Sequence, residues 1–451
     1  MENRESSVDR RDFIKSATVT GVGVMLSGSV APLLASAPGD RLRIGVMGLN
    51  GRGVVHAKGI ARMKNADLAY LCDVDSKVLD KGMADVAASR QSAGYTLTGG
   101  PPKPVGDFRR MLDDKGVDAV VIATPDHWHT PAAILAMQAG KHVYVDKPCG
   151  HNPREGELIV QAQQKYGKVV QMGTQQRSHD RSREIVQAIH DGAIGTPYLA
   201  RAWYANTRVG IGHGKPAPVP ANLDYELWQG PAPHTPYRDN VIHYNWHWFW
   251  LWGTGEVCNN GTHEIDIARW ALGVDFPIGI TSVGTRKHFD DDWEFPDAQE
   301  VCYEFAGGKT IVWQGQSCNG SKTQGRSRGT TILGTNGSVV MDRDGYTIYD
   351  LKDKVVKESI GAKGDALNTS ADDNSTLVHV ENWLNGIRSG ERLNAPIDDG
   401  AKSVLLCHLG NIAQKTGRKI RTDPANGHIL DDKEAQRMWS REYAPAWAPV
   451  V

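Results

Sequence analysis

The chain has 451 residues, and its 51 basic and 52 acidic side chains give a formal net charge of −1. This balance argues against binding to nucleic acid, because affinity for a phosphate backbone needs a basic excess or a basic stripe. With 23% charged and 40% hydrophobic residues, the composition is that of a folded globular protein. Its six cysteines form no C-x-x-C pair, so free thiols are expected.

Residues 1–38 predict an export signal and linker. Arg10 and Arg11 precede a weakly apolar stretch that ends in Ala35-Ser36-Ala37, an order of residues typical of a secretory leader. The paired arginines before Phe-Ile-Lys resemble a twin-arginine signal, which predicts a periplasmic or otherwise exported protein. Pro38 hinders cleavage after Ala37, so the leader could remain as a membrane tether; no integral span is expected elsewhere. The alternative is a disordered N-terminus with a chance apolar patch.

Residues 39–175 predict a Rossmann dinucleotide-binding domain. The apolar run Leu42–Met47 leads into the glycine-rich turn Gly48–Gly53, then a helix-like stretch, and a second apolar run that ends at Asp73. This is the order that a Rossmann site requires, with the turn against a pyrophosphate and the acid on a ribose. Because Asp73 would repel a 2′-phosphate, NAD is expected rather than NADP. Asn50 replaces the second fingerprint glycine, so a plain βα turn is the alternative.

Further strands and helices alternate up to residue 175. The strands are expected at Val117–Ala123, His142–Val145 and Val169–Met172, and the helices at Pro131–Ala139 and Glu155–Tyr166. Two of these strands end in polar motifs, Thr124-Pro125-Asp126-His127-Trp128-His129 and Asp146-Lys147-Pro148. The carboxyl ends of parallel strands are where open α/β sheets bind ligands.

Residues 176–421 predict a second domain. After a helix at Arg181–Asp191, strands are separated by Gly and Asp turns, which favours a mainly antiparallel open sheet with helices on one face. The fold class is thus α/β plus α+β. The expected strands are Tyr198–Tyr204, Gly279–Thr285, Gln299–Phe305, Thr310–Gln314, Thr330–Leu333 and Ser338–Met341. A late helix is expected at Ala401–Thr416, and residues 422–451 are a C-terminal tail.

Four motifs together resemble the Gfo/Idh/MocA family of sugar and cyclitol oxidoreductases. They are G-L-N-G-R-G, T-P-D-H-W-H, A-G-K-H-V-Y-V-D-K-P and N-N-G-T-H-E-I-D, and the resemblance runs from Leu42 to Arg421. The family usually has E-K-P, so Asp146 is a charge-preserving departure. The resemblance implies NAD, a small carbohydrate substrate, a second domain that forms one wall of the site, and a homodimer or homotetramer.

By this resemblance Lys147 is the catalytic lysine, which exchanges the substrate hydroxyl proton, since a positive nicotinamide nearby lowers the pKa of an ammonium. His263 matches the family's D-x-G-x-H histidine, with Asn259 at the aspartate position, where it can hydrogen-bond but cannot take a proton. Thr262 is a plausible helix N-cap that places His263 in the first turn, where a neutral imidazole is favoured.

The expected cofactor-binding residues are Gly48, Asn50, Gly51, Arg52, Gly53, Asp73, Thr124, Pro125, His127, His129, Lys147 and Gln175. The expected substrate-binding residues are Arg177, Trp246, His247, Trp248, Asn259 and His263. For His127, capping a loop is an equal alternative.

Tryptophans recur at every second residue from Trp246 to Trp252, which on an extended chain puts them on one face. Indoles stack on sugar rings, so a carbohydrate platform is one interpretation; a core or interface role is the other. His247 would lie on the opposite face as a third candidate proton carrier. Asp290–Asp292 is interpreted as a solvated loop, and no metal is expected.

The leading hypothesis is an NAD-dependent oxidoreductase, with tightly bound cofactor, that acts on a hydroxyl of a sugar, glycoside or cyclitol. Because an exported enzyme has no obvious NAD pool, the cofactor must be regenerated on the protein. One alternative is a redox-neutral NAD-dependent glycosidase that uses transient C3 oxidation, elimination, hydration and re-reduction. A second is a non-catalytic NAD-binding sugar sensor.

Overall fold

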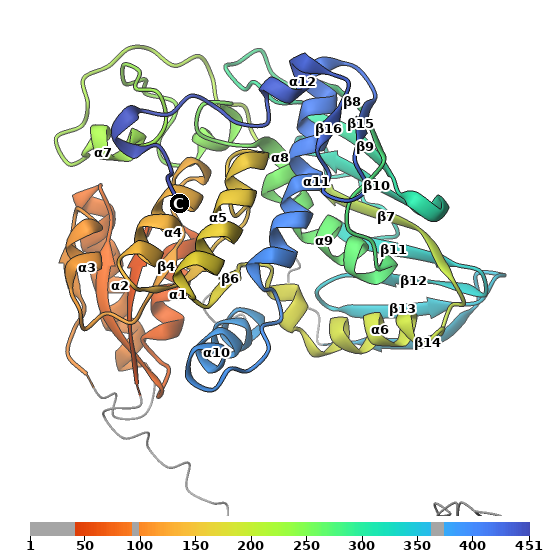
Figure 1. The fold of residues 1–451 in the computed structure, drawn as a ribbon, viewed down its shortest axis with the longest axis horizontal. Helices are drawn as coiled ribbons and strands as arrows, with labels where there is room; N and C mark the ends of the chain where they lie inside the picture. Colours follow the sequence, from red (N-terminus) through yellow and green to blue (C-terminus); the bar gives the residue numbers. More distant parts are fainter. Residues whose placement is uncertain (1–40, 93–98, 362–373) are drawn as a thin grey trace, which may run out of the picture.

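The computed structural model describes residues 41–92, 99–361 and 374–451, which form the ribbon in Figure 1. The predicted export signal at 1–38 lies outside the described residues. Two sheets organise the chain, one in each half (Figure 1).

The first sheet has six parallel strands in the order β3-β2-β1-β4-β5-β6, as predicted for a Rossmann domain. The strands are β1 (Leu42–Met47), β2 (Ala66–Cys72), β3 (Lys103–Val105), β4 (Ala119–Ile122), β5 (His142–Val145) and β6 (Val170–Met172). The connecting helices are α1 (Arg52–Ile60), α2 (Ser76–Gln91), α3 (Arg109–Asp113), α4 (His129–Gln138) and α5 (Pro153–Tyr166). Every residue of β4 is buried, which explains its unbroken apolar run.

The second sheet has ten strands in the order β14-β13-β12-β11-β7-β10-β9-β8-β15-β16. They are β7 (Pro197–Ala205), β8 (Gly279–Thr285), β9 (Ala298–Glu304), β10 (Thr310–Gln316), β11 (Arg328–Gly334), β12 (Gly337–Met341), β13 (Gly345–Tyr349), β14 (Val355–Ile360), β15 (Ile420–Thr422) and β16 (Ile429–Leu430). Among the described strand pairs of this second sheet only β7–β10 is parallel, so the mainly antiparallel sheet is confirmed.

Helices cover one face of this sheet, as expected (Figure 1). They are α6 (Asp180–His190), α9 (Gly261–Leu272) and α11 (Ile397–Thr416), with α8 (Gly255–Asn259) packed beside them. Their apolar side chains join the sheet in one buried cluster that includes Ile265, Trp313 and Leu406. Helix α11 starts four residues earlier than the predicted late helix.

Three parts of the second half pack on the first domain. Helix α10 (Asn374–Ser389) inserts Trp383 into the core around Ile44. The segment between β7 and α8, which carries α7 (Tyr225–Gln229), pairs Leu223 with Asp75 and reaches over the first domain (Figure 1). After α12 (Lys433–Arg437) the chain end crosses the same domain, with Trp447 packed on its core.

All six cysteines are free, as the sequence predicts. Within the described ranges, no helix combines the length and apolar character that a membrane span needs.

Candidate active site

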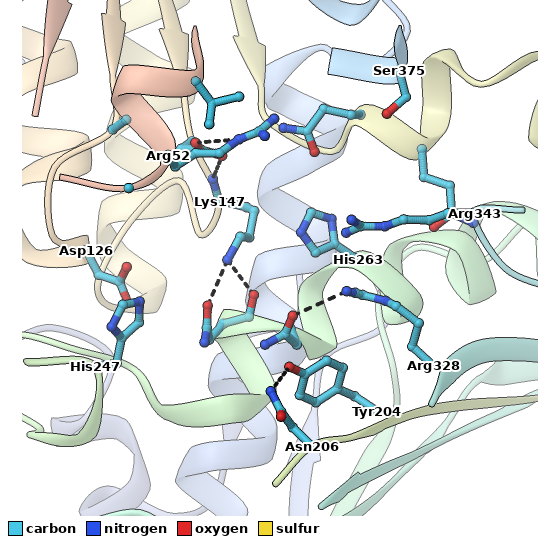
Figure 2. A pocket seen from close by; sticks show the side chains of 18 of the residues that line it. Arg52, Asp126, Lys147, Tyr204, Asn206, His247, His263, Arg328, Arg343 and Ser375 are labelled. Carbon is cyan, nitrogen blue, oxygen red and sulfur yellow. Dashed lines mark hydrogen bonds and ion pairs between the residues drawn. The ribbon is translucent and has the colours of Figure 1, made fainter. Parts of the chain in front are cut away.

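A cavity of about 870 Å³ lies where the two domains meet. Its first side is formed by the glycine-rich turn and by residues that follow β4 and β5, among them Thr124 and Lys147. Its second side comes from the start of α9 and from β7 and β11. Residues from both halves of the chain thus face one space (Figure 2).

The glycine-rich turn has the geometry of a phosphate cradle. Gly48 and Gly51 have φ of 82° and 87°, a region that favours glycine, and a Cβ on Gly53 would lie 1.6 Å from the carbonyl oxygen of Gly48. Helix α1 begins directly after Gly51 without a side-chain cap, so its first N–H groups point at the cavity end of the turn. This arrangement fits the pyrophosphate of a dinucleotide.

A smaller hollow of about 80 Å³ continues from the turn and is lined by Gly48, Asp73 and Pro125. The Asp73 carboxylate accepts hydrogen bonds from the backbone N–H groups of Leu49 (2.7 Å) and Asp75 (2.9 Å), and burial raises its pKa. No Lys or Arg is present among the described residues lining this hollow. A ribose with free hydroxyls fits here better than one bearing a 2′-phosphate, which favours NAD.

Lys147 lies at the centre of the cavity, directly after β5. Its ammonium donates to the carbonyl oxygen (2.5 Å) and to Oδ1 (3.0 Å) of Asn259 at the end of α8 (Figure 2). Burial lowers the Lys147 pKa, an effect that the nearby carboxylates of Asp146 and Asp126 oppose. Lys147 can therefore exchange a proton with a bound hydroxyl, and Asn259 holds it in place.

Asp146 anchors the loop that carries Lys147. Its carboxylate lies 3.2 Å from Nε2 of buried His56 and 3.6 Å from Nε of Arg52, and it accepts the Lys147 backbone N–H. Burial acts against ionisation, but the contacts with His56, Arg52 and Lys147 prevail and lower the Asp146 pKa. The carboxylate is thus ionised and shared by the turn and the lysine loop.

His263 lies in the first turn of α9, as predicted, and lines the cavity. Thr262 is not the N-cap: the helix starts at Gly261, and the Thr262 hydroxyl donates to the Cys258 carbonyl oxygen (2.6 Å) because α8 runs almost directly into α9. Burial and then the cations Arg343 and Lys147 lower the His263 pKa well below its usual value. The lowered pKa keeps the imidazole neutral, and its buried Nδ1 has no hydrogen-bond partner among the described residues, so His263 can accept a proton.

The aromatic segment is not the extended strand that the tryptophan spacing suggested. Residues Asn245–Trp248 form a short 3₁₀ helix, which places Trp246 and Trp248 in different apolar clusters. Trp246 lines the cavity. Trp248 does not line it, because its ring is buried in a parallel stack with the ring of Trp293, and the two ring centroids are 3.8 Å apart. A common tryptophan face is therefore excluded, and only Trp246 remains as a candidate sugar contact.

His247 lines the cavity, and its ring stacks on the ring of Trp246 with the two centroids 3.6 Å apart. Its Nδ1 lies 2.6 Å from the Tyr244 carbonyl oxygen, which can only accept, so Nδ1 carries the proton and Nε2 is the free acceptor. Burial lowers the His247 pKa to about 3. His247 is thus a second neutral imidazole beside Lys147.

Two other predicted residues do not line the cavity. His127 is fully buried, with Nε2 2.8 Å from the Trp228 carbonyl oxygen, and it holds the segment that crosses from the second half. Arg177 forms a buried bidentate pair with Asp266 and a second pair with Asp399, tying α9 to α11. These contacts give both side chains packing roles. For His127 this agrees with the loop-capping alternative, and for Arg177 it differs from the expected substrate role.

The remaining predicted residues line the cavity or the smaller hollow, except Gly53, which packs against the Gly48 carbonyl group. His129 lies with Nε2 2.8 Å from the Thr124 carbonyl oxygen, and Gln175 donates toward the Tyr144 hydroxyl at 3.4 Å. Asn50, Gly51 and Arg52 line the same side.

Sequence reasoning missed most of the second wall. Arg208 forms an ion pair with Glu256 (2.7 Å), and Arg328 a bidentate pair with Glu264. The cavity is also lined by Tyr204, Asn206, His243, Asn260 and Arg343. Most of these residues sit on strands and loops far apart in the chain and belong to no local motif. Asn260 is the exception, because it lies in the N-N-G-T-H-E-I-D motif.

Comparison with known proteins gives the family. Residues 42–174 match the model described as the oxidoreductase family's NAD-binding Rossmann fold, and residues 200–448 match its C-terminal alpha/beta domain. Within the described ranges, no group of three or more His, Cys, Asp or Glu side chains could hold a metal ion.

Among curated relatives, a glycosyl hydrolase family 109 protein of Shewanella sp. (strain W3-18-1) is 25% identical over 215 residues, 44% of this chain and 46% of the relative. An alpha-N-acetylgalactosaminidase of Shewanella oneidensis is 23% identical over the same shares. The chain thus spans about half the length of these relatives.

Solved structures share the fold across most of this chain. The WlbA dehydrogenase of Bordetella pertussis, in complex with NADH and UDP-GlcNAcA, has a TM-score of 0.61 at 19% identity, covering 85% of this chain and 99% of its own. An oxidoreductase of Agrobacterium radiobacter in complex with NAD+, L-tartaric acid and magnesium has a TM-score of 0.62 at 16% identity, covering 84% and 98%. With both domain models matched, the chain belongs to the Gfo/Idh/MocA oxidoreductase family and carries an NAD-binding Rossmann domain.

Proposed function

We propose that the protein oxidises a hydroxyl of a sugar, glycoside or cyclitol with a tightly held NAD. The observation that carries this proposal is the placement of Lys147 and the neutral His263 in one cavity with the glycine-rich turn. NAD, when bound, supplies the hydride acceptor and donor for the substrate carbon.

The chain's residues supply binding and proton transfer. The turn from Gly48 to Gly53 and the start of α1 receive the phosphates, and Asp73 receives the ribose hydroxyls. Lys147 Nζ takes the proton of the substrate hydroxyl as the carbon is oxidised and returns it on reduction. Asn259 keeps Nζ in position because its backbone carbonyl oxygen and its Oδ1 both accept hydrogen bonds from Lys147. Asn259 can therefore orient the lysine although it stands where the family has an aspartate.

A redox-neutral glycosidase is the second candidate function, and two neutral imidazoles favour it. Once C3 of a glycoside is a ketone, the C2 proton becomes acidic; its removal and loss of the aglycone oxygen leave an enone, which water then hydrates. His247 Nε2 and His263 are both unprotonated acceptors in the cavity, so the C2 proton has a base distinct from Lys147. The curated relatives are named as glycosidases, which supports cleavage of a glycosidic bond by this candidate function.

The location and assembly belong to the same proposal. The paired arginines and small-residue site of 1–38 support export through the twin-arginine pathway, already folded and with NAD loaded. The alternate residues of β9 and β10 that face away from the helices are half-buried or exposed, which supports a homodimer or homotetramer through this open face. Cell fractionation measures the location, and light scattering measures the oligomeric state.

One experiment tests the activity. The protein is purified without added cofactor, its nucleotide is released and identified, and a panel of chromogenic glycosides and free sugars is offered. Stoichiometric NADH without aglycone identifies a dehydrogenase, and aglycone release without net NADH identifies the redox-neutral cycle. Lys147→Met should strongly lower the rate of either reaction. Nucleotide and sugar binding without turnover would leave a sensor, and failure to bind any nucleotide refutes the proposal.

A further inference from the structure

The second wall of the cavity is rich in arginine. Arg181 comes from α6, Arg328 from β11 and Arg343 from the turn between β12 and β13, and all three line the cavity. Figure 2 shows the guanidinium groups of Arg328 and Arg343 pointing from this wall toward His263. Arg181 lies close to the backbone here, since a Cβ on Gly361 would be 2.9 Å from its Nη1.

Basic residues outnumber acidic ones among the described lining residues. The basic ones are Arg52, Lys147, Arg181, Arg208, Arg328 and Arg343, and the acidic ones are Asp126, Asp146 and Asp344. Asp126 and Asp146 belong to the cofactor side, so Asp344 is the single described acid that lines the arginine wall. Among the described side chains that line the cavity, the substrate side therefore carries more basic than acidic groups.

Two arginines of this wall, Arg208 and Arg328, form ion pairs with glutamates, but Arg328 still has N–H donors that are not used in its ion pair. Glu256 engages Arg208, and Glu264 binds Nε and Nη2 of Arg328. The Nη1 of Arg328 reaches Asn260 Oδ1 only at 3.5 Å, so this edge of the guanidinium keeps donors for a ligand.

The electrostatic effect is visible at His263. After burial, the cations Arg343, Lys147, Arg328 and Arg52 are the groups that lower its pKa. Four cations from both domains thus act on the point where a substrate ring would lie.

We propose that the substrate carries an oxyanion, the carboxylate of a uronic acid or a sulfate ester, which binds Arg343 and the Nη1 edge of Arg328 while its reacting hydroxyl faces Lys147. Guanidinium groups match such oxyanions with paired, charge-assisted hydrogen bonds. A neutral sugar offers these donors only hydroxyl oxygens. The inference rests on the proposed function for the position of the ring, and it narrows the substrate class from sugars in general to acidic sugars.

Equilibrium binding to the NAD-loaded protein tests this without requiring turnover. The probes are matched pairs of 4-nitrophenyl glycosides: the glucuronide against the glucoside, the galacturonide against the galactoside, and 6-sulfated against unsulfated N-acetylglucosaminide. Quenching of tryptophan fluorescence reports binding, since Trp246 lines the cavity. We expect at least one acidic member to bind ten- to a hundredfold more tightly than its neutral partner. The pairs that respond distinguish carboxylate from sulfate.

Variants assign the preference to the wall. Arg343→Gln should reduce the preference for the acidic member at least tenfold, and Arg343→Lys should restore part of it. Arg421→Gln removes an exposed arginine of β15 and should change nothing. Retention of NAD by each variant shows that it is folded.

The result that overturns the inference is the absence of any acidic probe that binds tenfold more tightly than its neutral partner. A preference that survives Arg343→Gln also overturns it. If neutral sugars are nevertheless turned over, the proposed function is still supported. If acidic probes bind preferentially but yield neither NADH nor aglycone, the proposed function is refuted and the oxyanion site is still supported.

Discussion

Arg441 in the C-terminal tail provides a sharp test of how the site is held together. Its guanidinium donates to the carbonyl oxygens of His127 (3.1 Å) and Leu251 (3.3 Å), and its Nε lies 3.5 Å from Oε1 of Glu155. Glu155 is on α5 with its side chain fully buried, and His127 directly follows Asp126, which lines the cavity. One side chain thus joins the tail, the first domain and the loop from the second half.

Arg441→Met keeps the aliphatic stem and removes the charge and the donors. Loss of one partner of a buried ion pair costs about 3–5 kcal/mol because the other charge stays buried. Glu155 still accepts hydrogen bonds from the His151 N–H (2.7 Å) and the Tyr443 hydroxyl (2.9 Å), so the cost should lie at the lower end of this energy range. We therefore expect the free energy of unfolding of the first domain to fall by about 3 kcal/mol.

The pH dependence of this loss has a definite sign. Burial raises the Glu155 pKa in the folded protein, and Arg441 is the largest influence that lowers it. Without Arg441 the folded pKa rises further, so Glu155 takes up a proton as the pH falls and the buried charge disappears. The destabilisation should be smaller at pH 5 than at pH 8.

Urea unfolding followed by tryptophan fluorescence measures the effect. With a slope near 2 kcal/mol per molar, the expected loss lowers the midpoint by about 1.5 M. The control is Arg421→Gln, an arginine paired with Asp431 but 67% exposed, for which an exposed pair predicts at most about 1 kcal/mol. The reasoning is refuted if the midpoint of Arg441→Met shifts no more than that of the control, or if its shift is larger at pH 5 than at pH 8. The variant should also lose NAD faster during gel filtration.

Four further measurements follow from the site. Lys147→Met should lower kcat about 10²- to 10⁴-fold with thermal stability kept, measured by initial rates and melting curves. The pH profile of kcat/KM should rise through the Lys147 pKa, which burial sets below its usual 10.5, with no His263 step between pH 5 and 8. Asp73→Asn should reduce the preference for NAD over NADP about tenfold in titrations of both nucleotides, by removing the charge that repels a 2′-phosphate. Burial lowers the pKa of His127 to about 3 and of His379 to about 4, below the unfolded 6.5; stability should therefore fall as the pH drops below about 6.5, by about 2 kcal/mol for each at pH 5, measured by urea unfolding.

The fold was largely predictable because its signals are local. Buried parallel strands read as apolar runs, and β1 and β5 have the predicted bounds. Functional groups placed directly after a strand, such as Lys147 after β5, were predictable for the same reason, since the sheet alone sets where they point. The placement of His263 in the first turn of α9 was also predicted correctly, although Thr262 is not the N-cap residue.

What the sequence could not give depends on contacts between distant segments. Trp246 to Trp252 has the spacing of a strand, but Trp248 stacks on Trp293 and the backbone turns as a 3₁₀ helix to allow it. His127 and Arg177 are polar residues near motifs, but each finds its partners in another part of the chain: a carbonyl oxygen of Trp228 in one case and carboxylates of α9 and α11 in the other. A polar residue beside a motif therefore needs its partners known before it is given a role.

The arginine wall and the neutral histidines are linked by the same field. Arg343 and Arg328 lower the His263 pKa, which keeps the imidazole unprotonated but also weakens it as a base. An oxyanion seated on these arginines offsets their charge, so the His263 pKa must rise when an acidic substrate binds. In this scheme the substrate strengthens the base that acts on it, while a neutral sugar leaves the base weak. Discrimination would then be larger in kcat/KM than in affinity, which direct comparison of the two ratios decides.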